Sequence, residues 1–167
     1  MPSIEQLRNE VIQARIAISR KLGAAEQRLA EAPPHALGRQ MSVWIATAGR
    51  AMAGLVSPAA AGLTFKEALA TIGAASEVLV RLAQASADTA QLERYAAAQQ
   101  ALVNEAAALV NLDWSMRDEQ YRALTADLKS ASGTLKEARA RAQAAAKALN
   151  ITADLLSAFS KLVGALA

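Results

Sequence analysis

Side chains able to carry out chemistry are scarce in this chain of 167 residues. The single histidine, His35, lies in a Pro-Pro-His-Ala turn, and the sequence contains no cysteine. A zinc site needs three or four nitrogen, sulfur or oxygen ligands, and His35 lacks a second histidine or a cysteine as partner. We therefore expect His35 to be an exposed turn residue, and the sequence predicts no metal and no other cofactor.

The acidic residues form no pattern typical of a catalytic site. Asp118 and Glu119 are neighbours along the chain, and adjacent helix residues point in different directions, so they are not a preformed acid–base pair. The chain also lacks the Glu-x-x-His motif of di-iron bundles, a glycine-rich phosphate loop and a Gly-x-Ser-x-Gly nucleophile turn. The sequence therefore predicts a protein that is not an enzyme.

The densest basic stretch comprises Lys136, Arg139, Arg141 and Lys147, which could contact nucleic-acid phosphates. Glu137 interrupts this stretch, and no aromatic residue alternates with the basic ones to stack on bases. Across the whole chain, 18 basic and 15 acidic residues give a net charge of only +3. Nucleic-acid binding is therefore not expected.

The segment 40–65 is unusually apolar, because Arg50 is its only charged residue. Its small residues would allow close helix contacts like those of membrane helices. The favoured interpretation is a central buried helix, because an arginine at the membrane centre costs about 2.5–3.5 kcal/mol. The amphipathic segment 151–166 could likewise lie on a membrane or dock on the rest of the protein. The candidate membrane or partner surface comprises Met41, Trp44, Ile45, Met52, Leu55, Leu156, Phe159 and Val163.

The elements that would position these residues are helices. Hydrophobic residues make up 53% of the chain but aromatic residues only 4%, so alanine and the aliphatic residues carry the apolar content. Alanine and leucine have high helix propensity. Ser3 with Gln6 and Thr64 with Glu67 are capping-box signatures of helix starts. The predicted helices span residues 4–31, 35–56, 65–112, 115–149 and 152–166.

Residues 86–89 leave two alternatives open for the third helix. Asp88 with Gln91 could cap a new helix, yet no glycine or proline forces a break. Leu92 and Tyr95 resume helical spacing at once. We therefore expect a continuous or merely kinked helix over 65–112, with two shorter helices as the alternative.

An apolar seam follows in the fourth helix, and it must be covered by another helix. Its phase continues across Gly133, which predicts one helix ending at a cap on Asn150. The seam consists of Tyr121, Leu124, Leu128, Ala131, Leu135, Ala138, Ala142, Ala145 and Leu149.

Together these patterns predict a single all-α domain over residues 1–167. It is expected to be an elongated antiparallel bundle of four to six helices with long coiled-coil-like seams. We expect a non-catalytic protein that acts by protein–protein interaction or self-assembly. The alternative is a membrane-active protein, pore-forming or membrane-binding, that inserts residues 40–65 or its C-terminal helix. The N-terminal sequence does not resemble a secretory signal, which predicts a cytoplasmic protein or export by another route.

Overall fold

The computed structural model describes residues 2–31, 63–112 and 121–166. All regular structure within these ranges is helical, which confirms the predicted all-α bundle. The helix predicted over 35–56 lies outside the described residues. The described helices are α1 (Ile4–Ala30), α3 (Phe65–Ala85), α4 (Thr89–Val110), α5 (Ala126–Ser130), α6 (Ser132–Ala145) and α7 (Ala153–Leu166).

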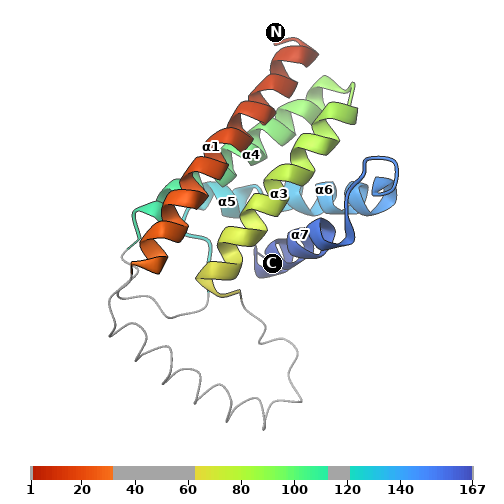
Figure 1. The fold of residues 1–167 in the computed structure, drawn as a ribbon. Helices are drawn as coiled ribbons and strands as arrows, with labels where there is room; N and C mark the ends of the chain where they lie inside the picture. The colour runs from red at the N-terminus through yellow and green to blue at the C-terminus, as the bar shows by residue number, and fades with distance from the viewer. Residues whose placement is uncertain (1, 32–62, 113–120, 167) are drawn as a thin grey trace.

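Helices α1, α3 and α4 lie side by side, and α5, α6 and α7 run across them (Figure 1). Helices α1 and α4 point in the same direction, and α3 points in the opposite one. Helix α7 packs against α3 and α6, while α5 packs against α4. Helix α3 therefore lies at the centre, in contact with α1, α4, α6 and α7.

The two predicted capping boxes are confirmed. The Ser3 hydroxyl accepts a hydrogen bond from the Gln6 amide at 3.2 Å, and the Ser3 amide donates to Gln6 Oε1 at 2.8 Å. Thr64 and Glu67 form the same reciprocal pair at the start of α3. These local bonds satisfy amides that have no partner within the helix.

The expected continuous helix over 65–112 is wrong, because the chain leaves the helical conformation at Ser86. Ser86 is extended, with ψ of 139°, and α4 begins only at Thr89. Asp88 Oδ1 accepts hydrogen bonds from the amides of Ala90 at 3.0 Å and Gln91 at 3.4 Å. The cap therefore stabilises a turn that needs neither glycine nor proline, and α4 folds back beside α3.

The expected single helix over 115–149 is also wrong, although its seam is largely buried. Residues 121–125 are not helical, Ala131 separates α5 from α6, and α6 ends at Ala145. The seam residues still face the core on both sides of this interruption, since Leu128 and Leu135 are both fully buried. Leu124 leaves the seam and is 37% exposed.

Asn150 ends this region in the left-handed conformation, with φ of 54°, as expected for a helix-terminating residue. The Ile151 amide donates to the Ala146 carbonyl at 2.8 Å, which closes the turn before α7. The terminal helix predicted over 152–166 is confirmed as α7.

Candidate functional site

An open groove of about 560 Å³ lies between α1 and α4. The two helices run side by side in the same direction (Figure 1). Ala14, Ala17, Ala96 and Ala97 line the groove, and Val103 lies at one end. Since an alanine side chain is a single methyl group, neither helix fills the space between them.

Contacts beneath the groove hold α1 and α4 together. The fully buried Gln99 of α4 donates its side-chain amide to the Val11 carbonyl of α1 at 2.9 Å. Beyond the groove, towards the C-terminal ends of both helices, Arg28 donates to the Val110 carbonyl at 2.5 Å. These bonds lock the register of the two helices, so the groove is a preformed feature of the fold.

The walls of the groove are polar and acidic. Glu10 and Gln13 stand on α1, and Glu93 and Gln100 stand on α4. Within the described ranges, neither Glu10 nor Glu93 forms an ion pair or a side-chain hydrogen bond. An apolar floor between uncompensated carboxylates is a surface that a helix with small and basic residues would complement.

A second polar centre is buried where α4 meets the segment 121–125. Glu105 has no exposed surface, and its carboxylate accepts four hydrogen bonds. The donors are the Tyr121 hydroxyl at 2.6 Å, the Leu124 amide at 2.6 Å, and the amide and hydroxyl of Thr125 at 3.0 and 2.9 Å. Burial, followed by the hydrogen bond to Glu105 and its charge, raises the pKa of Tyr121.

This centre is a joint between helices. Thr125 also caps α5 by accepting a hydrogen bond from the Leu128 amide at 3.3 Å. Glu105 therefore accepts hydrogen bonds from the backbone amides that precede α5, and it fixes that helix against α4. All four acceptor interactions are made within the chain.

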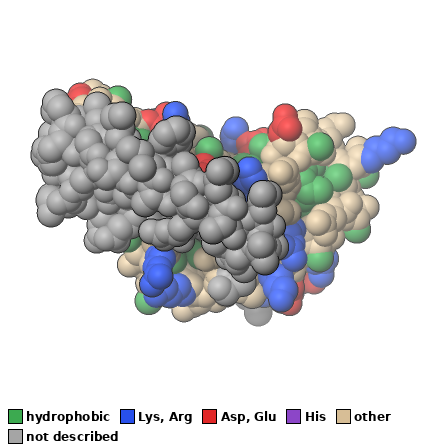
Figure 2. Space-filling view, turned by 90° about the horizontal axis from the view of Figure 1, so that it is seen from below, with side chains coloured by type: hydrophobic (Ala, Val, Ile, Leu, Met, Phe, Trp, Pro, Cys, Tyr) green, Lys and Arg blue, Asp and Glu red, His purple; other side chains and the backbone are tan. Residues whose placement is uncertain are grey.

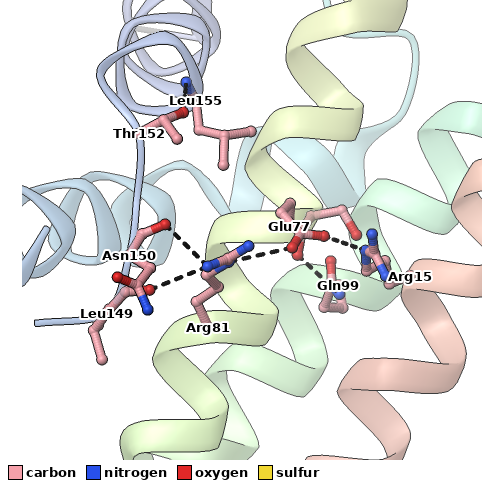
Figure 3. Close-up of polar contacts among 9 residues, drawn as sticks. Arg15, Glu77, Arg81, Gln99, Leu149, Asn150, Thr152 and Leu155 are labelled. Carbon is pink, nitrogen blue, oxygen red and sulfur yellow. Dashed lines mark hydrogen bonds and ion pairs between the residues drawn. The ribbon is translucent and has the colours of Figure 1, made fainter. Parts of the chain in front are cut away.

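A third polar centre connects α3 with α1 and with the turn before α7 (Figure 3). Glu77 forms ion pairs with Arg15 of α1 and with Arg81, the latter at 3.3 Å. Arg81 also donates to the carbonyls of Leu149 at 3.2 Å and Asn150 at 2.9 Å. Arg81 thereby fastens the end of the α6 region to the central helix.

A smaller open cavity of about 280 Å³ lies where α6 approaches the turn between α3 and α4. When the Gln91 side-chain amide is assigned with its oxygen towards Arg141, that oxygen accepts hydrogen bonds from Arg141 Nη1, from Nε at 3.0 Å and from Nη2 at 2.9 Å. In the same orientation the Gln91 amide nitrogen donates to the Ser86 hydroxyl at 2.6 Å. Burial raises the pKa of Tyr95, which also lines the cavity. Arg141 is thus held by Gln91 and serves as another link between helices.

The basic stretch that could contact phosphates is partly engaged within the chain. Arg141 turns onto Gln91, and Glu137 pairs with Arg94 of α4 at 3.1 Å. Lys136 and Lys147 are exposed. Charges of both signs lie across the visible part of one face of the molecule (Figure 2).

The residues predicted to meet a membrane or partner are only partly described. Met41, Trp44, Ile45, Met52 and Leu55 lie outside the described residues, as does His35. On α7, Phe159 and Val163 are buried against the bundle and Leu156 is half-buried. The role of these residues at a membrane or partner stays a prediction.

Helix α3 is long and apolar enough to cross a membrane by length and composition, and it alone meets that criterion among the described helices. However, 67% of its most apolar window is buried inside the protein. This burial is what the central helix of a bundle requires. No group of three or more potential metal ligands occurs among the described residues.

The α1–α4 groove was missed from the sequence. Ala14 lies at helical spacing with the buried Leu7, Val11 and Ile18, yet it is half-buried and lines the groove. A recognisable signal is the run of alanines at positions 96–98 between Glu93 and Gln100 in α4, together with Ala14 and Ala17 three residues apart in α1. Comparisons of the chain with protein-family models, curated proteins and solved structures gave no match.

Proposed function

We propose that this chain is a non-catalytic helical-bundle protein that acts by binding a protein helix in the groove between α1 and α4. The observation that supports this function most directly is the alanine-lined floor of that groove. Ala14 and Ala17 face Ala96 and Ala97 across a space of about 560 Å³. Small residues let a third helix approach both helices at the short end of the usual interaxial range of roughly 8–10 Å.

The groove has the dimensions of a short helix-binding site. Its lining extends from Leu7 to Ala17 on α1 and from Glu93 to Val103 on α4. At about 1.5 Å per residue, each wall is on the order of 15 Å long, or about three helical turns. A helix bound there would present anchors at every third or fourth position, as in other helix-in-groove complexes.

The other polar centres support the assignment of the binding site to the groove. Their described contacts join helices of this chain, so their side chains are already used in holding the fold together. Glu105 holds α5 to α4, Arg81 holds the α6 end to α3, and Arg141 holds α6 to the α3–α4 turn. The side chains of Glu10 and Glu93, by contrast, line an open surface.

Site-specific photo-crosslinking tests this function. A photoreactive amino acid replaces Gln13, which lines the groove, and in a separate chain it replaces Ser19 on the opposite side of α1. We expect the Gln13 position to form a discrete crosslinked protein adduct under native conditions, and the Ser19 position to form none. No adduct at Gln13, or equal adducts at both positions, would contradict the proposed function.

A further inference from the structure

The groove-facing side of α1 changes its charge from one end to the other. Glu10, Ala14, Ala17 and Lys21 follow each other at steps of four, three and four residues, so they lie on one helix face. The face is therefore acidic towards its N-terminal end, basic towards its C-terminal end, and lined with methyl groups between them.

The charged groups on this face have no charge partner among the described residues. Glu10 is exposed and Lys21 is half-buried, and neither forms an ion pair or side-chain hydrogen bond there. Among the other charged residues of α1, Arg15 pairs with Glu77 and Arg28 donates to Val110, whereas Arg20 and Glu26 are exposed and also form no ion pair within the described residues. The pattern of Glu10 and Lys21 is thus not needed to hold α1 in its own bundle.

This face is complementary to itself when it is reversed. If two copies of α1 lie antiparallel about the midpoint between Ala14 and Ala17, each Ala14 faces Ala17 of the other copy. The same register places each Glu10 opposite Lys21 of the other copy, because both are four residues from the neighbouring alanine. In a parallel arrangement, like charges would face each other, which is unfavourable.

We propose that the partner helix in the α1–α4 groove is α1 of a second copy of this chain, bound antiparallel across a two-fold axis. This inference rests on the proposed function and names its partner. The facing alanines allow close contact, and two symmetry-related pairs of Glu10 with Lys21 fix direction and register. Because each copy contributes the same face, the contact is closed and produces a dimer instead of a filament.

Helix α4 adds to the same polarity. Because α1 and α4 run in the same direction, Glu93 lies towards the same end of the groove as Glu10 (Figure 1). A reversed α1 would bring its basic half, which carries Arg20 and Lys21, to this acidic end. The charges on both walls therefore favour the antiparallel orientation.

Sedimentation velocity of the full chain over a range of concentrations tests this dimer. The wild-type protein is expected to form a dimer that weakens as salt is added, because its charge pairs are screened. Glu10→Lys and Lys21→Glu each place like charges opposite one another and should raise the dissociation constant about tenfold or more. The double variant restores opposite charges and should return the constant to within about threefold of wild type.

Glu26→Lys is the matched control, because it makes the same charge change on an exposed position on the other side of α1. It should leave dimerisation unchanged. Circular dichroism of each variant verifies that the helices remain folded, as expected for substitutions at side chains outside the core.

A wild-type protein that is monomeric at every concentration would overturn the dimer. A dimer that is equally stable in Glu10→Lys, or that the double variant fails to restore, would overturn this interface. If the chain is monomeric while Gln13 crosslinks a protein of different mass, this inference fails and the proposed function stands. If Gln13 also yields no adduct, both fail.

Discussion

At the scale of single residues, Glu105 shows how the chain accommodates a fully buried carboxylate. Burying a charge is costly unless hydrogen bonds replace those made by water. Tyr121, Leu124 and Thr125 supply these bonds from a segment that is otherwise outside the helices. The same bonds decide where α5 begins.

Replacing Glu105 by glutamine is therefore expected to destabilise the protein. An amide nitrogen would face hydrogen-bond donors in place of one carboxylate oxygen, and bonds to a charged acceptor are worth about 1.5–3 kcal/mol. Urea unfolding should show a loss in this range for Glu105→Gln. The exposed Glu26→Gln serves as control and should change stability by less than about 0.5 kcal/mol. Equal stabilities would show that the buried carboxylate contributes nothing.

Tyr121 should make the protein sensitive to alkaline pH. Its pKa is raised in the folded state by burial and by Glu105, whereas an unfolded tyrosine has a pKa of about 10. Above about pH 10 the unfolded state loses this proton while the folded state keeps it, so the free energy of unfolding falls as pH rises. Below that pH both states are protonated, and Tyr121 contributes no pH dependence.

Tyr121→Phe removes this group and should give a shallower loss of stability above about pH 10, although it lowers stability at neutral pH. Tyr95, whose pKa is also raised, remains in both proteins and sets the residual slope. Urea unfolding at a series of pH values measures the difference. Parallel declines for the two proteins would contradict the role given to Tyr121.

Residue-scale features could be predicted from the sequence only where the partners are close along the chain. The capping boxes at Ser3 and Thr64 join residues three positions apart, and they were found. Glu105 bonds to residues 16 to 20 positions away, across a segment without periodicity. The one local signal is its position three residues after Leu102 and four before Leu109, on the apolar side of α4. That spacing does not identify its bonding partners.

At the scale of helices, periodicity predicted which side is buried better than where a helix ends. Leu128 and Leu135 keep their phase although Ala131 separates their helices. The sequence pattern did not favour a turn at Ser86, because apolar residues recur at helical spacing both before and after it. Its stability depends on a side-chain cap from Asp88 and on the packing of α4 beside α1, and the second of these is a tertiary effect.

Charged substitutions in this seam should be severe. Leu128→Asp and Leu135→Asp each remove a fully buried side chain and bury an unpaired carboxylate, with an expected loss of at least about 3 kcal/mol. Gln143→Asp, at an exposed position of α6, should have a far smaller effect. Thermal and urea unfolding of the three variants measure this, and near-wild-type stability of either leucine variant would contradict the buried seam.

At the scale of the whole molecule, alanine-rich composition and helical spacing were sufficient to predict an all-α bundle. They did not predict that α1 and α4 run in the same direction. That arrangement arises because α3, which lies between them in the chain, runs in the opposite direction. The groove arises from this arrangement. Helical spacing alone does not show whether its alanines are covered, and only the packed structure shows that one side of them remains open.

The central claim is that two copies of α1 meet antiparallel, and cysteine pairing tests this register most directly. Because the chain has no cysteine, an introduced pair reports a single contact. A disulfide requires Cβ atoms about 3.5–4.5 Å apart. The measurement mixes Ala14→Cys chains with size-tagged Ala17→Cys chains under mild oxidation and quantifies each disulfide product.

We predict that the mixed product of Ala14→Cys with Ala17→Cys forms in preference to either product between identical chains. Ser19→Cys, on the opposite side of α1, should form little product with either partner. Random pairing among all three chains, or no disulfide between Ala14→Cys and Ala17→Cys, would contradict the antiparallel dimer.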